Sequence, residues 1–250
     1  MDTKLLILIS ISVSIVTAVF TFIKPLSQPE AYHHFADSRR MLGVPNALDV
    51  LSNGAFCVVG LMGVFYVAGL LGTPGNRAAH ISYLTFFAGL FLTGLGSGWY
   101  HMEPDNGRLV WDRLPMTIAF AGFFCSVLSE LVSPSLGLRL LAPLLLVGIL
   151  SVFYWIATER QGRGDLRPYT LVQFLPMILI PVIFYLYESP LQYSFYVGAL
   201  ISFYILAKIF ESLDKLIYSM GSPVSGHTLK HLSAAAGSLC LLIMLEVRFV

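Results

Sequence analysis

The sequence contains few charged residues. Lys, Arg, Asp and Glu make up only 12% of its 250 residues, whereas 56% are hydrophobic. A soluble domain carries about 25% charged residues, and half that proportion cannot cover the surface of a compact soluble fold. The composition therefore excludes a soluble enzyme and a disordered chain, and it indicates a protein that lies in a lipid bilayer.

The sequence also has little net charge and few cysteines. The formal net charge is only +1, which makes nucleic acid an unsuitable partner. The three cysteines, Cys57, Cys125 and Cys240, form no Cys-x-x-Cys pair and lie inside apolar stretches, so they are expected to be small core residues. The chain has no internal repeat and no low-complexity segment.

Long apolar stretches dominate what is present. A spanning helix needs about 20 such residues, and eight stretches approach that length, at about residues 5–23, 47–71, 80–100, 114–132, 137–157, 169–187, 191–210 and 226–247. They lack the alternation of a membrane β-barrel. The sequence therefore predicts an all-α membrane protein whose loops are too short to hold a separate soluble domain.

The first stretch resembles a signal peptide only in part. Met1–Lys4 is a poor positive region, and no Ala-x-Ala cleavage site follows at Leu26–Glu30. We expect a retained, extra N-terminal transmembrane helix over residues 1–24, followed by a seven-helix domain over residues 32–250. Cleavage of this stretch is the alternative.

Positive charges distinguish the two sides of the membrane. The side opposite the N-terminus carries ten Lys and Arg residues: Lys24, Arg39, Arg40, Arg108, Arg113, Arg160, Arg163, Arg167, Lys208 and Lys215. The N-terminal side carries four, namely Lys4, Arg77, Arg139 and Arg248. By the positive-inside rule the side with ten faces the cytoplasm. A cleaved first stretch would invert this assignment.

Several polar residues lie where lipid-facing helices do not need them. Ser97 and His101 are four residues apart and share a helix face, in a segment whose Gly94 and Gly98 also suit close helix packing. Asp112 follows at the expected start of the fourth span, where it could also cap that helix. The segment is not a Gly-x-Ser-x-Gly nucleophile elbow, because the positions two residues from Ser97 are not glycine.

Two further histidines begin the last span. His227 and His231 are four apart and present two imidazoles on one helix face. Together with His101 and Asp112 they are expected at one level of the bundle, on the same side of the membrane. Three imidazoles with an open fourth position are the ligand set of catalytic zinc, so the pattern indicates a metal centre.

A fourth polar segment precedes the second span, also on that side. Either it is an interfacial loop in which Asn46 caps the helix, or Asp37, Asn46 and Asp49 supply oxygen ligands to a hard cation such as calcium.

These residues resemble the alkaline ceramidases, within a superfamily of seven-helix membrane hydrolases that also includes the progestin and adipoQ receptors. The resemblance rests on Ser97-x-x-x-His101, on Asp112 eleven residues later, on His227-x-x-x-His231, and on the segment from Pro45-Asn46 to Ser52-Asn53. It covers about residues 32–245 and leaves the first helix outside.

The resemblance implies a role for each residue. His101, His227 and His231 would hold zinc, Ser97 would help to polarise the amide oxygen, and Asp112 would handle the proton of the attacking water. Ceramidases also bind calcium near their amino terminus through a Trp-Cys-Glu run, where this chain has Phe35-Ala36-Asp37; this departure leaves the calcium site open.

The expected activity is hydrolysis of the amide bond of ceramide or a related membrane lipid to a fatty acid and a long-chain amine. Three alternatives remain. The chain could be a receptor or sensor of the adipoQ type with little catalysis. It could be a transporter with a histidine proton relay, although no repeat supports this. It could also be a serine hydrolase using Ser97, His101 and Asp112, which leaves His227 and His231 unexplained.

Overall fold

The computed structural model describes residues 2–249, and within them it contains helices and no strands. Eight helical segments are long and apolar enough to cross a membrane, which confirms the predicted all-α membrane fold. The spans are α1 (Thr3–Phe22), α2 (Ala47–Ser52) with α3 (Gly54–Leu70), α4 (Arg77–Met102), α5 (Asn106–Val127) with the π-turn η2 (Leu128–Val132), α6 (Pro134–Arg160), α7 (Arg167–Leu186), α8 (Leu191–Ser212) and α10 (Gly226–Phe249). Two short helices, η1 (Glu30–His33) and α9 (Asp214–Ser219), lie between spans.

The chain divides into two compact units, and three of the five boundaries between them fall inside α3, α4 and α5. The first unit comprises residues 1–29, 67–86 and 117–189, and the second comprises residues 30–66, 87–116 and 190–250. Helix α1 therefore groups with α6 and α7, and every candidate site residue belongs to the second unit.

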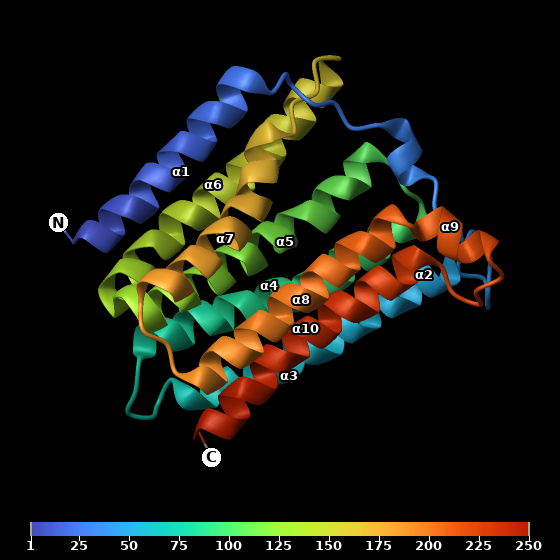
Figure 1. Cartoon of the computed structure of the whole chain (residues 1–250). Coiled ribbons are helices and arrows are strands. Elements are labelled where there is room, and N and C mark those ends of the chain that lie inside the picture. Colours follow the sequence, from blue (N-terminus) through green and yellow to red (C-terminus); the bar gives the residue numbers. More distant parts are fainter. Residues whose placement is uncertain (1, 250) are drawn as a thin grey trace. The chain divides into compact units, whose positions relative to one another are not determined.

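In the first unit, α1 lies along α7, and α7 packs on α6 (Figure 1). Asp2 accepts a hydrogen bond from the Lys4 amide over 3.1 Å and caps the start of α1. Helix α7 contains Pro176 and Pro181, which a membrane helix tolerates because neighbouring groups satisfy the freed carbonyls.

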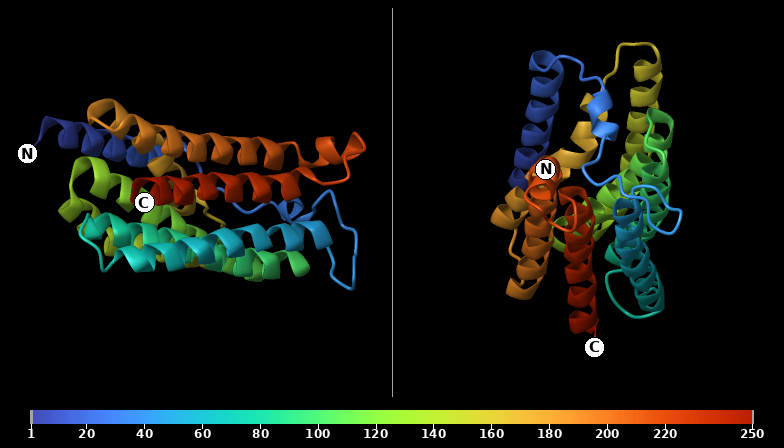
Figure 2. Two further views of the ribbon diagram at one scale, coloured as in Figure 1. Left: turned by 90° about the horizontal axis from the view of Figure 1, so that it is seen from below. Right: turned by 90° about the vertical axis from the view of Figure 1, so that its right-hand side faces the viewer.

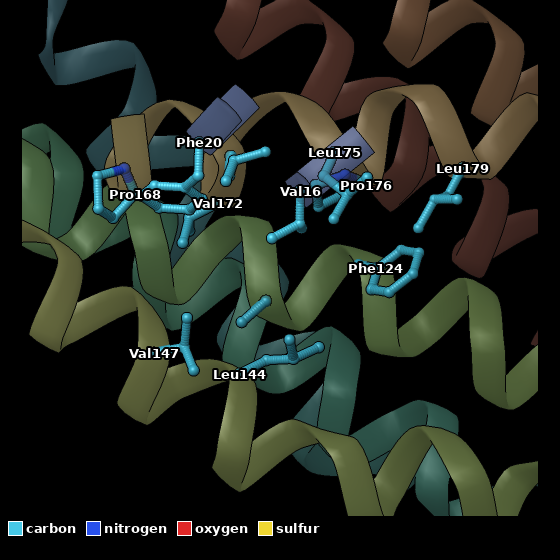
Figure 3. Close-up of a pocket in the computed structure, with 12 residues that line it drawn as sticks. Val16, Phe20, Phe124, Leu144, Val147, Pro168, Val172, Leu175, Pro176 and Leu179 are labelled. Atoms are coloured by element: carbon cyan, nitrogen blue, oxygen red, sulfur yellow. The ribbon is translucent and has the colours of Figure 1, made fainter. Parts of the chain in front are cut away.

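An apolar pocket of about 350 Å³ lies in the same unit. Figure 3 shows that α1 contributes Val16 and Phe20 to its wall, while α5 contributes Phe124 and α7 contributes Leu175. No titratable side chain lines it, so the pocket offers hydrophobic contact only.

In the second unit, α8 and α10 run side by side (Figures 1 and 2), and α10 also contacts α2 and α9. The start of α10 is tightly held. A Cβ atom at Gly226 would collide with the backbone of Phe210 and Asp214, and Ser225 caps the helix by accepting a hydrogen bond from the Thr228 amide over 2.9 Å. The position of the two histidines in the first turns of α10 is therefore well defined.

Candidate metal centre

Three histidines meet inside the second unit. His101, near the end of α4, and His227 and His231, at the start of α10, are 1%, 5% and 2% exposed. One ligand atom from each lies within 4.8 Å of the others, and the ring centroids are separated by 4.7, 5.0 and 4.8 Å. The structure therefore brings together the histidines that the sequence placed at one level.

The ring nitrogens have the spacing of metal ligands. Nε2 of His101 lies 3.2 Å from Nε2 of His227. Two nitrogens bound to one tetrahedral zinc at about 2.0–2.1 Å would be about 3.3 Å apart. The pair therefore needs little movement to hold a metal ion.

A hydrogen bond defines the tautomer of His231. Its Nδ1 lies 2.8 Å from the Ser52 hydroxyl, and that hydroxyl donates its proton to the Asp49 carbonyl over 3.1 Å. Ser52 must then accept from His231, so Nδ1 carries the ring proton and Nε2 has a free lone pair. Metal-binding histidines are commonly oriented by such a bond from the second ring nitrogen.

The carboxylate of Asp49 fixes α10 relative to α2. It is fully buried, and its Oδ1 accepts hydrogen bonds from Ser225 over 2.9 Å and from Thr228 over 2.7 Å. Asp214 accepts a further bond from the His227 amide over 2.8 Å. The start of α10 is thereby held by two carboxylates.

Ser97 on α4 and Asp112 on α5 form a buried polar pair. Gly96 permits it, because a Cβ atom there would collide with the backbone of Trp111, so α4 and α5 approach closely at this point. Ser97 and Asp112 are 3% and 8% exposed, and the serine hydroxyl donates a hydrogen bond to the carboxylate.

The alternative role of Asp112 as a helix cap is wrong. Helix α5 begins at Asn106, so Asp112 lies almost two turns inside it. Asp105 is the cap, since its Oδ1 accepts a hydrogen bond from the Arg108 amide over 2.8 Å. The Asp112 side chain is therefore available for a role inside the bundle.

A serine triad has no support from the contacts of His101. Among the described residues, His101 is hydrogen-bonded to neither Ser97 nor Asp112, and its Nδ1 is buried without a partner. Ser97 contacts Asp112 directly instead. A triad would need the imidazole between these two side chains.

The loop before α2 covers the histidines. The Phe35 ring centroid lies 4.5 Å from those of both His101 and His227. The Ala36 amide donates to Asp214 over 3.0 Å, and nearby His33 contacts Tyr100 through Nδ1 at 2.9 Å. This loop therefore shields the imidazoles on one side.

The three candidate calcium ligands each have protein partners. Asp37 forms a two-point ion pair with Arg39, at 2.8 and 2.7 Å, and the guanidinium holds the pKa of this carboxyl below its usual value. Asn46 occupies the cap position of α2, but its side chain makes no cap bond and donates to the His101 carbonyl over 2.8 Å. In residues 2–249, only the histidine triad forms a cluster of three or more His, Cys, Asp or Glu ligand atoms.

These observations fit a metal ion. The donors are three buried imidazoles; the Nε2 atoms of His101 and His227 face each other, and Ser52 sets the tautomer of His231. Burial of three imidazoles otherwise costs free energy unless each finds a partner. A bound metal ion would be a partner for all three imidazoles at once.

Two contributors to the site were not among the sequence-based candidates. Ser52 orients His231, and Phe35 lies against the rings of His101 and His227. Both residues belong to segments that the resemblance compares with ceramidases, but the sequence alone indicated neither the contact of Ser52 with His231 nor that of Phe35 with the histidine rings.

Comparison with known proteins adds no family assignment. No protein-family model matches the chain, and no curated protein matches it significantly.

Proposed function

We propose that this chain is an intramembrane, zinc-dependent amidase that cleaves the amide bond of ceramide or a related lipid. The supporting observation is the buried triad His101, His227 and His231 in spanning helices, with the Ser97–Asp112 pair on the same two-helix segment as His101. The resemblance to alkaline ceramidases supplies the reaction class.

The metal and the carboxylate have complementary roles. Zinc held by the three histidines would polarise the amide carbonyl and lower the pKa of a water molecule to about 7. Asp112 would accept the proton of the attacking water as a general base, and then deliver it to the leaving amine nitrogen as a general acid.

The hydrogen bond between Ser97 and Asp112 would link proton uptake by Asp112 to stabilisation of the amide oxygen by Ser97. While Asp112 is ionised, the Ser97 hydroxyl donates to it and has no proton for the substrate. Once Asp112 takes up a proton, it can donate to the Ser97 oxygen instead. The serine O–H is then released to stabilise the negative charge that develops on the amide oxygen.

A lipid substrate explains the location of the site. The triad lies in helices that span the membrane, where a substrate with long acyl chains is already concentrated. The excess of Lys and Arg on the loops at this end supports a site that faces the cytoplasm under the positive-inside rule.

The test is turnover of acyl-labelled ceramide by the purified full-length chain. The proposal predicts release of labelled fatty acid that stops on chelation, returns with zinc and resists serine-directed reagents. Absence of release from zinc-loaded protein would favour a receptor or sensor. Release that survives chelation but is lost with a serine reagent would favour a serine hydrolase.

A further inference from the structure

A cluster of charged side chains lies beside the metal centre. Glu211 on α8 contacts two ammonium groups, Lys208 Nζ at 2.6 Å and Lys230 Nζ at 2.5 Å. Two ammonium groups and one carboxylate give this trio a charge of +1. Charged side chains within spanning helices are costly and usually serve a function.

Stability of the helix pair does not require both lysines. Lys208 and Glu211 are three residues apart on α8, so their contact joins no two helices. Lys230 alone connects α10 to α8 through Glu211. The cluster therefore contains more positive charge than the link between the helices needs.

The position of Lys230 relates it to the reaction site. It immediately precedes His231 and lies three residues after His227, and its positive charge is close enough to the Asp112 carboxylate to interact with it. It is four residues into α10, which places it about 6 Å from the helix start at 1.5 Å per residue. Lys230 therefore lies near one end of the span, the end that the polar part of a membrane lipid can reach.

The ammonium group of Lys230 retains donors for a ligand. It has three N–H bonds, and among the described residues its hydrogen-bond partner is Glu211. Its side chain is 19% exposed, so it is mostly buried but still accessible to a ligand. Charge-assisted hydrogen bonds to carboxylate or phosphate oxygens are among the strongest that such a group makes.

We infer that Lys230, supported by Lys208 and Glu211, binds an anionic group on the amine side of the lipid amide. The preferred substrate then carries a carboxylate or phosphate next to the amide, and neutral ceramide is a poorer substrate. This inference rests on the proposed function, because it assigns the substrate class of the same site.

The test compares lipids that differ only in this charge. In the first pair, N-palmitoylglycine and N-palmitoylethanolamine share the acyl chain, but the first carries a carboxylate where the second carries a hydroxyl. In the second pair, ceramide 1-phosphate carries a phosphate where ceramide carries a hydroxyl. Binding is measured in Asp112→Asn protein, which we expect not to turn lipid over, and kcat/KM is measured in the otherwise unmodified chain.

The inference predicts at least tenfold tighter binding of the anionic member of one pair, a preference that weakens as salt rises. The pair that shows it identifies the group as carboxylate or phosphate. Lys230→Gln should reduce the preference at least tenfold. This change leaves Glu211 paired with Lys208, so it does not create an isolated carboxylate. Lys208→Gln, which keeps the contact between helices, should reduce it in the same direction.

Lys215→Gln is the matched control, because Lys215 is an exposed lysine on α9 and its loss should leave the preference intact. Equal binding of both members of both pairs would overturn the inference, as would a preference that persists in both Lys230→Gln and Lys208→Gln. Selective binding without hydrolysis of any lipid would retain this subsite and reject the amidase.

Discussion

The Ser52 hydroxyl accepts a hydrogen bond from Nδ1 of His231 over 2.8 Å, and donates a hydrogen bond to the Asp49 carbonyl. This bond leaves Nε2 of His231 as the free ligand atom. The remaining ligands, His101 and His227, already face each other through Nε2 at 3.2 Å. Ser52 therefore prepares the triad for a metal ion without contacting it.

Ser52→Ala should weaken zinc binding about 10–100-fold, the usual effect of removing a partner that orients a metal-binding histidine. The measurement is competition for zinc against a chromophoric chelator. Ser238→Ala is the matched control, because Ser238 lies on the same helix as His231 and donates only to the Ala234 carbonyl. Equal zinc affinity of the Ser52 and Ser238 variants would contradict the orienting role.

Asp112→Asn should retain zinc and lose turnover by about 10²–10⁴-fold, because it removes a proton carrier and no ligand. Turnover and metal content measured on the same preparation check this. A variant that loses its zinc would make Asp112 part of the ligand set. A variant with full turnover would show that Asp112 takes no part in the reaction.

The polar residues of the centre could be predicted from the sequence because they interrupt apolar stretches at helical spacing. Helix ends were less predictable. The fourth apolar stretch begins near residue 114, whereas α5 begins at Asn106, because a hydropathy pattern excludes the charged pair Asp112 and Arg113 although the helix continues through them.

Contacts between distant residues could not be predicted. Ser52 and His231 are 179 positions apart, and Lys230 and Glu211 lie on separate helices. Spacing within a helix indicates which face a side chain occupies, but it does not indicate which helix packs against that face. The orienting bond and the charged cluster depend on that packing.

The ion pair of Asp165 and Arg167 offers a test of how α1 is attached. Its two contacts measure 2.8 and 2.7 Å, and Arg167 also donates to the Ile23 carbonyl over 2.9 Å. The adjacent Leu166 amide donates to the Leu26 carbonyl over 2.9 Å. The segment that follows α1 is therefore bound to the start of α7.

This attachment should depend on pH in one direction. Arg167 holds the pKa of Asp165 below its usual value, so the stabilisation is complete above the unfolded-state pKa of about 4 and disappears as pH falls through the lower folded-state pKa. Exchange of the Leu166 amide, corrected for its intrinsic rate, should keep constant protection from pH 8 to 5 and lose it below pH 4.

Asp165→Asn should lower the protection of the Leu166 amide between pH 8 and 5, where the carboxylate of the unmodified chain is ionised, and the difference between the two proteins should disappear as pH falls well below 4. Glu188→Gln is the control, since Glu188 is exposed in the same unit. Unchanged protection in the Asp165 variant would show that the pair does not hold the segment.

The membrane orientation predicts the behaviour of reporter fusions. With eight spans and the positive-inside rule, a reporter active only in the cytoplasm should be silent at the carboxyl terminus and active after Gly162. The reverse pattern would place the metal centre toward the outer face, and would favour cleavage of the first helix.

Zinc content of the purified chain is the most direct test of the account. Elemental analysis should find about one zinc per chain in the unmodified protein, and almost none after His101→Ala, His227→Ala or His231→Ala, because three imidazoles form the site. His80→Ala replaces a buried histidine outside the triad and should retain the metal. Full zinc occupancy in the His101→Ala protein, or a zinc-free unmodified chain that still cleaves its lipid substrate, would contradict the assignment.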